Sequence, residues 1–141
     1  MEYEGVLQLR PFKKEIMDFI KEETLKAGKA NIVKIEAIKE GIDVYFDRKS
    51  WLLALWKKLR YRWPGLFKFT KKLHTMRDGR LIHRVTLLFR PANFRIGDEF
   101  EFKDEKFKVL KIEGKKVLVR NLRTKEKTRI DFEKVEKIFR F

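Results

Sequence analysis

The order in which apolar periodicities follow one another is the feature of this chain that most restricts its fold. Within the first 90 residues, runs with the two-residue repeat of a strand are interspersed with runs that have the repeat of a helix. Pro11 suits the first turn of one helix and Gly28 its end, while Asp78-Gly79 favours a tight hairpin. The expected elements are a strand over residues 3–10, a helix over 11–27, strands over 32–38 and 42–46, a helix from residue 50 to Trp63-Pro64-Gly65, and strands over 67–73 and 81–90.

This order is the split βαβ arrangement with one extra hairpin strand. It predicts an antiparallel sheet with both helices on one face, as in ferredoxin-like folds. Ser50 precedes an apolar helical run, so we expect its hydroxyl to cap the second helix. The expected inward positions of the first hairpin are Val33, Ile35, Ile42, Val44 and Phe46.

The pattern changes after Pro91, where helical spacing disappears and short alternating runs begin. The expected strands span residues 94–102, 107–112, 117–122 and 128–130, and residues 132–141 form a fifth strand or a short helix. The chain is therefore predicted to belong to the α+β class, with a ferredoxin-like domain over residues 1–90 and a small β-barrel domain over residues 91–141.

Positive charge is concentrated in the middle of the chain. The protein has 36 Lys and Arg against 21 Asp and Glu, which gives a net charge of +15. Residues 1–47 hold 8 basic and 10 acidic side chains, and residues 91–141 hold 15 and 10, whereas residues 48–90 hold 13 basic side chains and only Asp78. An almost unbroken block of one sign repels itself unless a polyanion neutralises it. We therefore expect this block to bind nucleic acid.

A solvated thermophilic surface is the alternative interpretation of the charge. Abundant Lys and Glu, a single Ser and no Cys are typical of thermophilic proteins. Ion-pair networks need both signs, however, so this explanation does not account for the excess in the middle of the chain.

The candidate contact residues belong to the second helix, its approach and the hairpin that follows. Their charges would hold phosphates and supply affinity rather than base sequence. Trp51 lies off the apolar stripe of the helix, so it either packs or stacks on a base. The predicted nucleic-acid contacts are Arg48, Lys49, Lys57, Lys58, Arg60, Arg62, Lys71, Lys72, His74, Arg77, Arg80 and Arg84.

Signatures of catalysis are nearly absent, so we expect a non-enzymatic protein without a cofactor or a metal. The chain has no Cys nucleophile, no glycine-rich phosphate loop and no paired-His helix motif. One alternative is a small ribonuclease that uses His74 or His83, or a metal on Asp43 and Asp47. Another is a module whose basic face meets an acidic protein.

Apolar runs in this chain are all shorter than a membrane span, and the N-terminus lacks the features of a signal peptide. We therefore expect a cytoplasmic protein that does not contact membranes. A small-molecule substrate is not expected either.

Four segments carry a family resemblance. They are a strand and helix over residues 5–23, EGIDVYF at residues 40–46, DGRLIHRVTLLFR at residues 78–90 and FRIGD at residues 94–98, with a basic helix between the second and the third. In this order and spacing, the chain resembles the archaeal members of the nonsense-mediated-decay-three family, the export adaptors of the large ribosomal subunit. The resemblance implies a maturation factor that docks on the large subunit through ribosomal RNA and large-subunit proteins. It also implies a barrel similar to that of translation factor five A.

The zinc part of that family has no counterpart in this sequence. Family members begin with paired-Cys zinc modules, and this chain contains no Cys. A stand-alone paralogue and a fragment both remain open as explanations. The resemblance therefore implies RNA docking more directly than the complete maturation role.

Overall fold

The computed structural model describes residues 2–140, and for residues 71–75 and 77 it describes the backbone alone. Contacts divide the chain into two compact units. The first comprises Met1–Trp63 and Phe67–Arg90, and the second comprises Pro64–Leu66 and Pro91–Phe141. The chain therefore passes between the units three times, because a three-residue segment within the first 90 residues belongs to the second unit.

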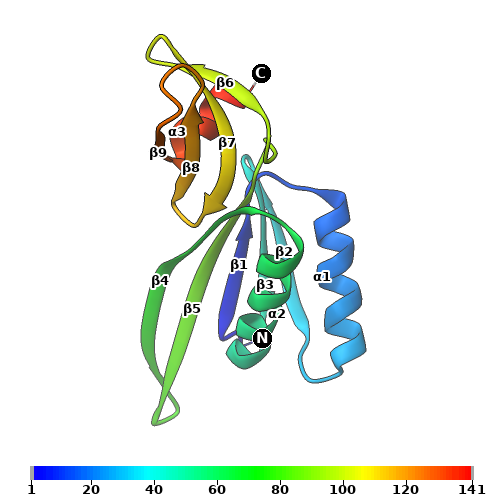
Figure 1. The fold of residues 1–141 in the computed structure, drawn as a ribbon. Coiled ribbons are helices and arrows are strands. Elements are labelled where there is room, and N and C mark those ends of the chain that lie inside the picture. Colours follow the sequence, from blue (N-terminus) through cyan, green and yellow to red (C-terminus); the bar gives the residue numbers. More distant parts are fainter. Residues whose placement is uncertain (1, 141) are drawn as a thin grey trace. The chain divides into compact units, whose positions relative to one another are not determined.

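The first unit is built on a five-stranded sheet in the order β2-β3-β1-β5-β4 (Figure 1). Both helices of this unit pack on one face of the sheet, as predicted. The elements are β1 (Gly5–Leu9), α1 (Lys14–Ala27), β2 (Ile32–Ile38), β3 (Gly41–Phe46), α2 (Lys49–Arg62), β4 (Gly65–Arg77) and β5 (Arg80–Pro91).

The sheet is mixed, so the prediction of an antiparallel sheet is wrong. β1 pairs antiparallel with β3 but parallel with β5. In a split βαβ sheet, the strand after α2 would lie beside β1 and run antiparallel to it. Here the chain continues from β4 through a turn with positive φ at Asp78 (48°) and Gly79 (76°), and the returning strand β5 lies beside β1. The extra hairpin strand thus occupies an interior position, and β4 is moved to the edge.

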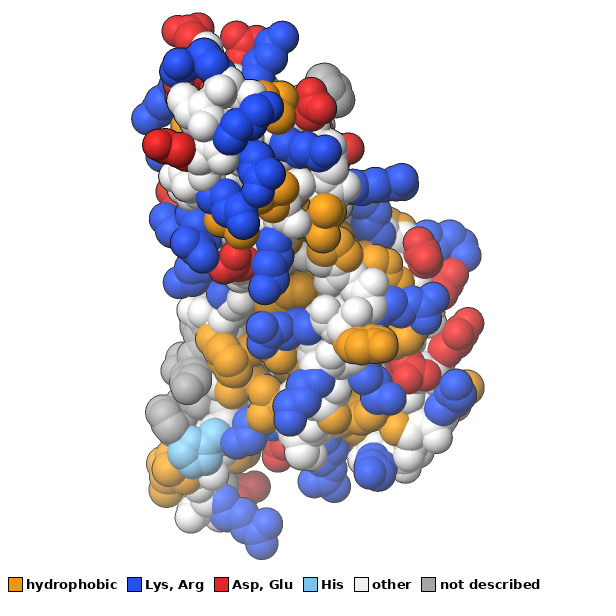
Figure 2. Space-filling model, in the orientation of Figure 1, with side chains coloured by type: hydrophobic (Ala, Val, Ile, Leu, Met, Phe, Trp, Pro, Cys, Tyr) orange, Lys and Arg blue, Asp and Glu red, His pale blue; other side chains and the backbone are white. Residues whose placement is uncertain are grey.

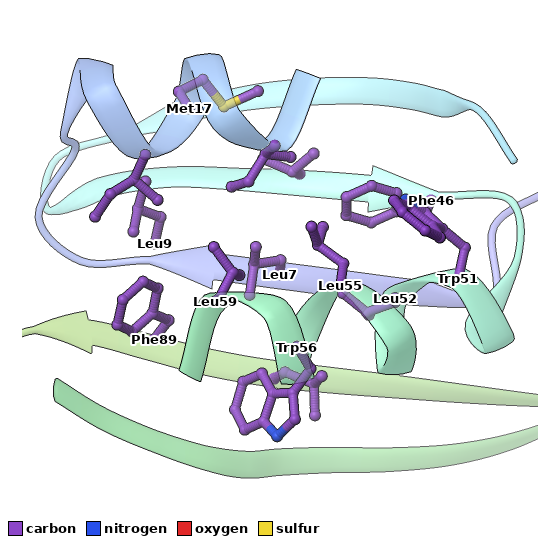
Figure 3. Close-up of a cluster of buried hydrophobic side chains, with 14 of the residues drawn as sticks. Leu7, Leu9, Met17, Phe46, Trp51, Leu52, Leu55, Trp56, Leu59 and Phe89 are labelled. Atoms are coloured by element: carbon purple, nitrogen blue, oxygen red, sulfur yellow. The ribbon is translucent and has the colours of Figure 1, made fainter. Parts of the chain in front are cut away.

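The core of the first unit lies between the sheet and the two helices. Figure 3 shows Leu55 and Leu59 of α2 lying over Leu7 of β1, with Leu9 and Phe89 on the same face of the sheet. All five side chains are fully buried. Burying apolar side chains of this size contributes about 1.5–3 kcal/mol each, so this face of α2 is fixed against the sheet.

The start of α2 differs from the expectation for Ser50. The helix begins at Lys49, so Ser50 lies inside its first turn and caps nothing. Instead, Oε1 of Glu4 accepts a hydrogen bond from the backbone N–H of Lys49 at 2.9 Å. A carboxylate at a helix N-terminus satisfies an unpaired N–H and complements the helix dipole.

Two of the predicted inward positions lie in β2. Ile35 is paired with Val44 but remains exposed, because β2 forms the edge of the sheet. Val33 is half-buried at an irregularity in the register between Ile32 and Lys34. The three positions in β3, in contrast, are buried as predicted: Ile42, Val44 and Phe46.

The second unit contains a four-stranded antiparallel sheet and one helix. Its elements are β6 (Glu99–Phe102), β7 (Glu105–Glu113), β8 (Lys116–Asn121), β9 (Lys127–Asp131) and α3 (Phe132–Phe139). The strands follow one another in the order β6-β7-β8-β9, and in the described part of the chain β6 and β9 are open edges. The sheet therefore does not close into the predicted barrel. α3 is the short helix that was one of the two expectations for the tail.

Side chains from outside these strands complete the core of the second unit. Phe94 lies 5.5 Å from Phe132 between ring centroids and is stacked on Phe139 at the same distance. Leu66, which is 2% exposed, belongs to the same apolar cluster. Of the helices that the structure describes in residues 2–140, none has the length and apolar character needed to cross a membrane.

Candidate nucleic-acid interface

α2 and the residue before it carry most of the predicted contacts whose side chains the structure describes. Because the leucines and tryptophans of this helix face the sheet, its charged residues point outward. In the first unit, Figure 2 shows Lys, Arg and hydrophobic side chains over α2, while most acidic side chains in this view lie over α1. The exposed cations of α2 and its approach are Arg48, Lys57, Lys58, Arg60 and Arg62.

Some of the predicted contacts have acidic partners from the first 23 residues. Lys58 donates a hydrogen bond to Glu23 at 3.2 Å, and this bond lowers the pKa of the Glu23 carboxyl below its usual value. Arg84 donates to the carbonyl of Tyr3 at 2.9 Å and to Glu2 at 3.1 Å. Its guanidinium also lies 4.4 Å from the centre of the Tyr3 ring. Arg84 is therefore engaged within the protein itself.

Two more of the predicted cations line a pocket that also contains acidic side chains. Lys49 and Arg80 line it together with the carboxylates of Glu2, Glu4 and Asp78. Opposite charges that line the same pocket partly neutralise one another. The cationic surface is therefore smaller than the sequence block, because folding brings acidic residues of the N-terminal segment next to it.

Two arginines near the end of α2 lie over aromatic rings. The guanidinium of Arg62 is 4.9 Å from the ring centres of both Phe19 and Trp63, and these two rings meet edge to face at 5.1 Å. The guanidinium of Arg60 is 5.9 Å from the Phe67 ring. Cation–π contacts restrict the position of a side chain without neutralising its charge. Both arginines therefore remain available to an anion.

A pocket next to these arginines contains an aromatic residue that the sequence analysis missed. It is lined by Phe19, Lys57, Lys58, Tyr61 and Arg62. Tyr61 is 95% exposed, the largest exposure among the large hydrophobic side chains that the structure describes. The helical spacing that places Leu55 and Leu59 inside could have identified it, because position 61 falls outside that apolar stripe.

Trp51, the aromatic residue singled out from the sequence, packs in the core. It is 7% exposed, and its Nε1 donates a hydrogen bond to Oγ1 of Thr24 at 3.0 Å. This leaves no indole face for a base. The remaining predicted contacts, Lys71, Lys72, His74 and Arg77, have side chains outside the described residues.

The carboxylates suggested for a ribonuclease metal site have structural contacts instead. Asp43 accepts a hydrogen bond from Arg10 at 2.5 Å. Asp47 accepts from the backbone N–H of Asn31 at 2.8 Å and from its side chain at 3.2 Å. Across the part of the chain with described side chains, no group of three or more His, Asp and Glu is placed to hold a metal ion.

Comparison with protein families finds a match over the first part of the chain. The family model described as NMD3, second domain, matches residues 2–90. The match includes α1, α2 and the complete run of strands from β1 to β5 apart from the final residue of β5. No curated protein matches the sequence. The matched stretch ends at Arg90, where the chain passes into the second unit for the last time.

Proposed function

This chain belongs to the NMD3 family of ribosome-related factors, and we propose that it is a non-enzymatic RNA-binding module that docks on the large ribosomal subunit. Its partners would be ribosomal RNA and large-subunit proteins, in the cytoplasm. The observation that carries the proposal is a set of three exposed cations on α2, Lys57, Arg60 and Arg62. Among the described residues, none of the three forms an ion pair with a carboxylate.

The chemistry of these side chains favours phosphate as the ligand. Arg60 and Arg62 present planar forks that match phosphate oxygens, and Lys57 adds a point charge. The hydrophobic face of α2 is fixed against the sheet, so the charges are held on a rigid element. Such contacts fix the position of an RNA backbone and carry little sequence information.

Neutralising the three cations is expected to reduce RNA affinity and its salt dependence. The variant is Lys57→Gln, Arg60→Gln and Arg62→Gln, assayed by a salt titration of binding to single-stranded RNA and to purified large ribosomal subunits. On single-stranded RNA each lost phosphate contact lowers the magnitude of the slope of log affinity against log salt by about 0.7, so the loss of three contacts should lower it by about two units. A matched control neutralises three exposed lysines that already have carboxylate partners: Lys14, Lys26 and Lys34.

Four outcomes separate the alternatives. Equal losses in both variants, with unchanged thermal melting, would mean that net charge alone binds RNA and that α2 is not the site. A flat salt titration of the wild type would remove the phosphate-contact mechanism and favour stacking or a protein partner. Cleavage of labelled RNA in the presence of magnesium or manganese would support the ribonuclease alternative. Binding without cleavage, and with a slope reduced only in the α2 variant, is the expected result.

A further inference from the structure

We propose that Tyr61 is a stacking platform for an unpaired nucleotide, with the cations beside it holding the neighbouring phosphates. This inference rests on the proposed RNA binding and makes it more specific. It assigns the pocket on the outer face of α2 to single-stranded RNA, such as a loop or a bulge, rather than to a duplex.

The exposure and position of Tyr61 are the first step. The side chain is 95% exposed, so nearly all of its ring surface is open to a ligand. Lys57 and Lys58 precede it by four and three residues, and on a helix these spacings place side chains next to one another. A flat apolar ring is therefore bordered by two cations on the same helix.

The pocket beside the ring is the second step. Phe19 of α1 forms part of its lining, and Arg62 is held over Phe19 and Trp63 at 4.9 Å from each ring centre. An arginine that is already restricted by aromatic contacts loses little rotamer freedom when it binds a phosphate. Lys57 and Arg62 can thus bind backbone phosphates on either side of a base that stacks on Tyr61.

The combination of ring and cations selects the kind of polyanion. A duplex offers phosphates, but its bases are stacked on one another and present no free face to a side chain. In a nucleic-acid strand every phosphate is accompanied by a planar base, whereas the carboxylates of an acidic protein are not each accompanied by a ring. Unpaired RNA supplies both phosphates and exposed base faces, and a base stacked on an aromatic side chain is a recurrent contact in single-strand binding.

The test compares Tyr61→Ala with wild type on three oligonucleotides of equal length: a single-stranded RNA, the same RNA with abasic sites, and a duplex. Stacking of one base corresponds to a loss of about 5- to 150-fold in affinity for the single strand when the ring is removed. The same substitution should leave affinity for the duplex and for the abasic strand unchanged. Tyr61→Phe should bind the single strand with an affinity close to that of wild type, because it retains the ring.

A control on another exposed apolar residue separates stacking from a general surface effect. Leu25 of α1 is 84% exposed, and Leu25→Ala should bind all three oligonucleotides like wild type. Thermal melting of each variant verifies the fold. If wild type binds none of the oligonucleotides, the proposed RNA binding itself fails. If wild type binds RNA but Tyr61→Ala binds the single strand with wild-type affinity, the stacking site is refuted while the phosphate contacts stand. An equal loss on single strand and abasic strand would also refute stacking.

Discussion

Substitution of Gly41 by alanine is expected to lower the free energy of unfolding of the first unit by more than about 4 kcal/mol, which places it among the most damaging single changes. A Cβ atom at this position would lie 2.0 Å from the carbonyl oxygen of Leu9 and 3.1 Å from its carbonyl carbon. Both are backbone atoms of β1, which pairs with β3 in the interior of the sheet. The clash is relieved only if these two strands separate.

Tryptophan fluorescence during urea unfolding measures this effect, because all three tryptophans lie in the first unit. Gly28→Ala is the matched control. Gly28 has a positive φ, of 62°, but apart from atoms of Gly28 and its two chain neighbours no heavy atom lies within 4 Å of a Cβ built there. Its substitution should cost only about 1–2 kcal/mol, the penalty of the left-handed conformation itself. Similar losses for both glycines would contradict the close approach at Leu9.

Removal of the Asp43 carboxylate is expected to destabilise the first unit by about 3–5 kcal/mol. Its partner Arg10 is only 6% exposed. The guanidinium donates to Asp43 at 2.5 Å, to the carbonyl of Ile42 at 2.7 Å and to the carbonyl of Leu9 at 3.2 Å. Asp43→Ala leaves this buried charge without its counter-ion, and the cost is much larger than that of breaking an exposed pair.

The control for this prediction is Asp18→Ala, which breaks an ion pair with Lys14 on the surface of α1. That loss should not exceed about 1 kcal/mol. In a double variant, Arg10→Met combined with Asp43→Leu should recover much of the stability, because no charge remains buried. A destabilisation of Asp43→Ala no larger than that of Asp18→Ala would show that the Arg10 pair is solvated.

Local sequence patterns predicted the helices and strands. The features that could not be predicted depend on contacts between residues far apart in the sequence. The helices and most strands were expected near their observed positions, since apolar spacing is a property of consecutive residues. The strand that pairs with β1 was not predicted, because the choice between β4 and β5 depends on pairing between residues that are 80 positions apart. The prediction of the cap of α2 was wrong for the same reason, because Glu4 lies 45 residues from the backbone N–H that it binds.

The predicted site had the same limitation. A charge count along the sequence identified the central block, but it counted only the carboxylate within that block. It did not include the carboxylates from other segments that folding brings next to these cations. Glu2 and Glu23 pair with Arg84 and Lys58. Among the described cations of this block, Lys57, Arg60 and Arg62 on α2 are exposed and form no ion pair with a carboxylate. Tyr61 could be predicted as exposed from helical spacing, whereas its pocket could not, because Phe19 comes from another helix.

The segment Pro64–Leu66 belongs to the second unit but lies in the sequence between two parts of the first unit. The two units are therefore difficult to separate by recombination between genes. The backbone N–H of Ala92 donates to the carbonyl of Pro64 at 3.0 Å, and the Leu66 side chain fills part of the core that residues 91–141 build. A gene segment that encodes residues 91–141 alone would produce a core without this leucine, a defect that costs about 2–5 kcal/mol when a buried leucine is truncated. The second unit therefore cannot be transplanted as one contiguous piece. A recombination event that moves it intact must carry the sequence from Pro64 onward, including the hairpin of the first unit.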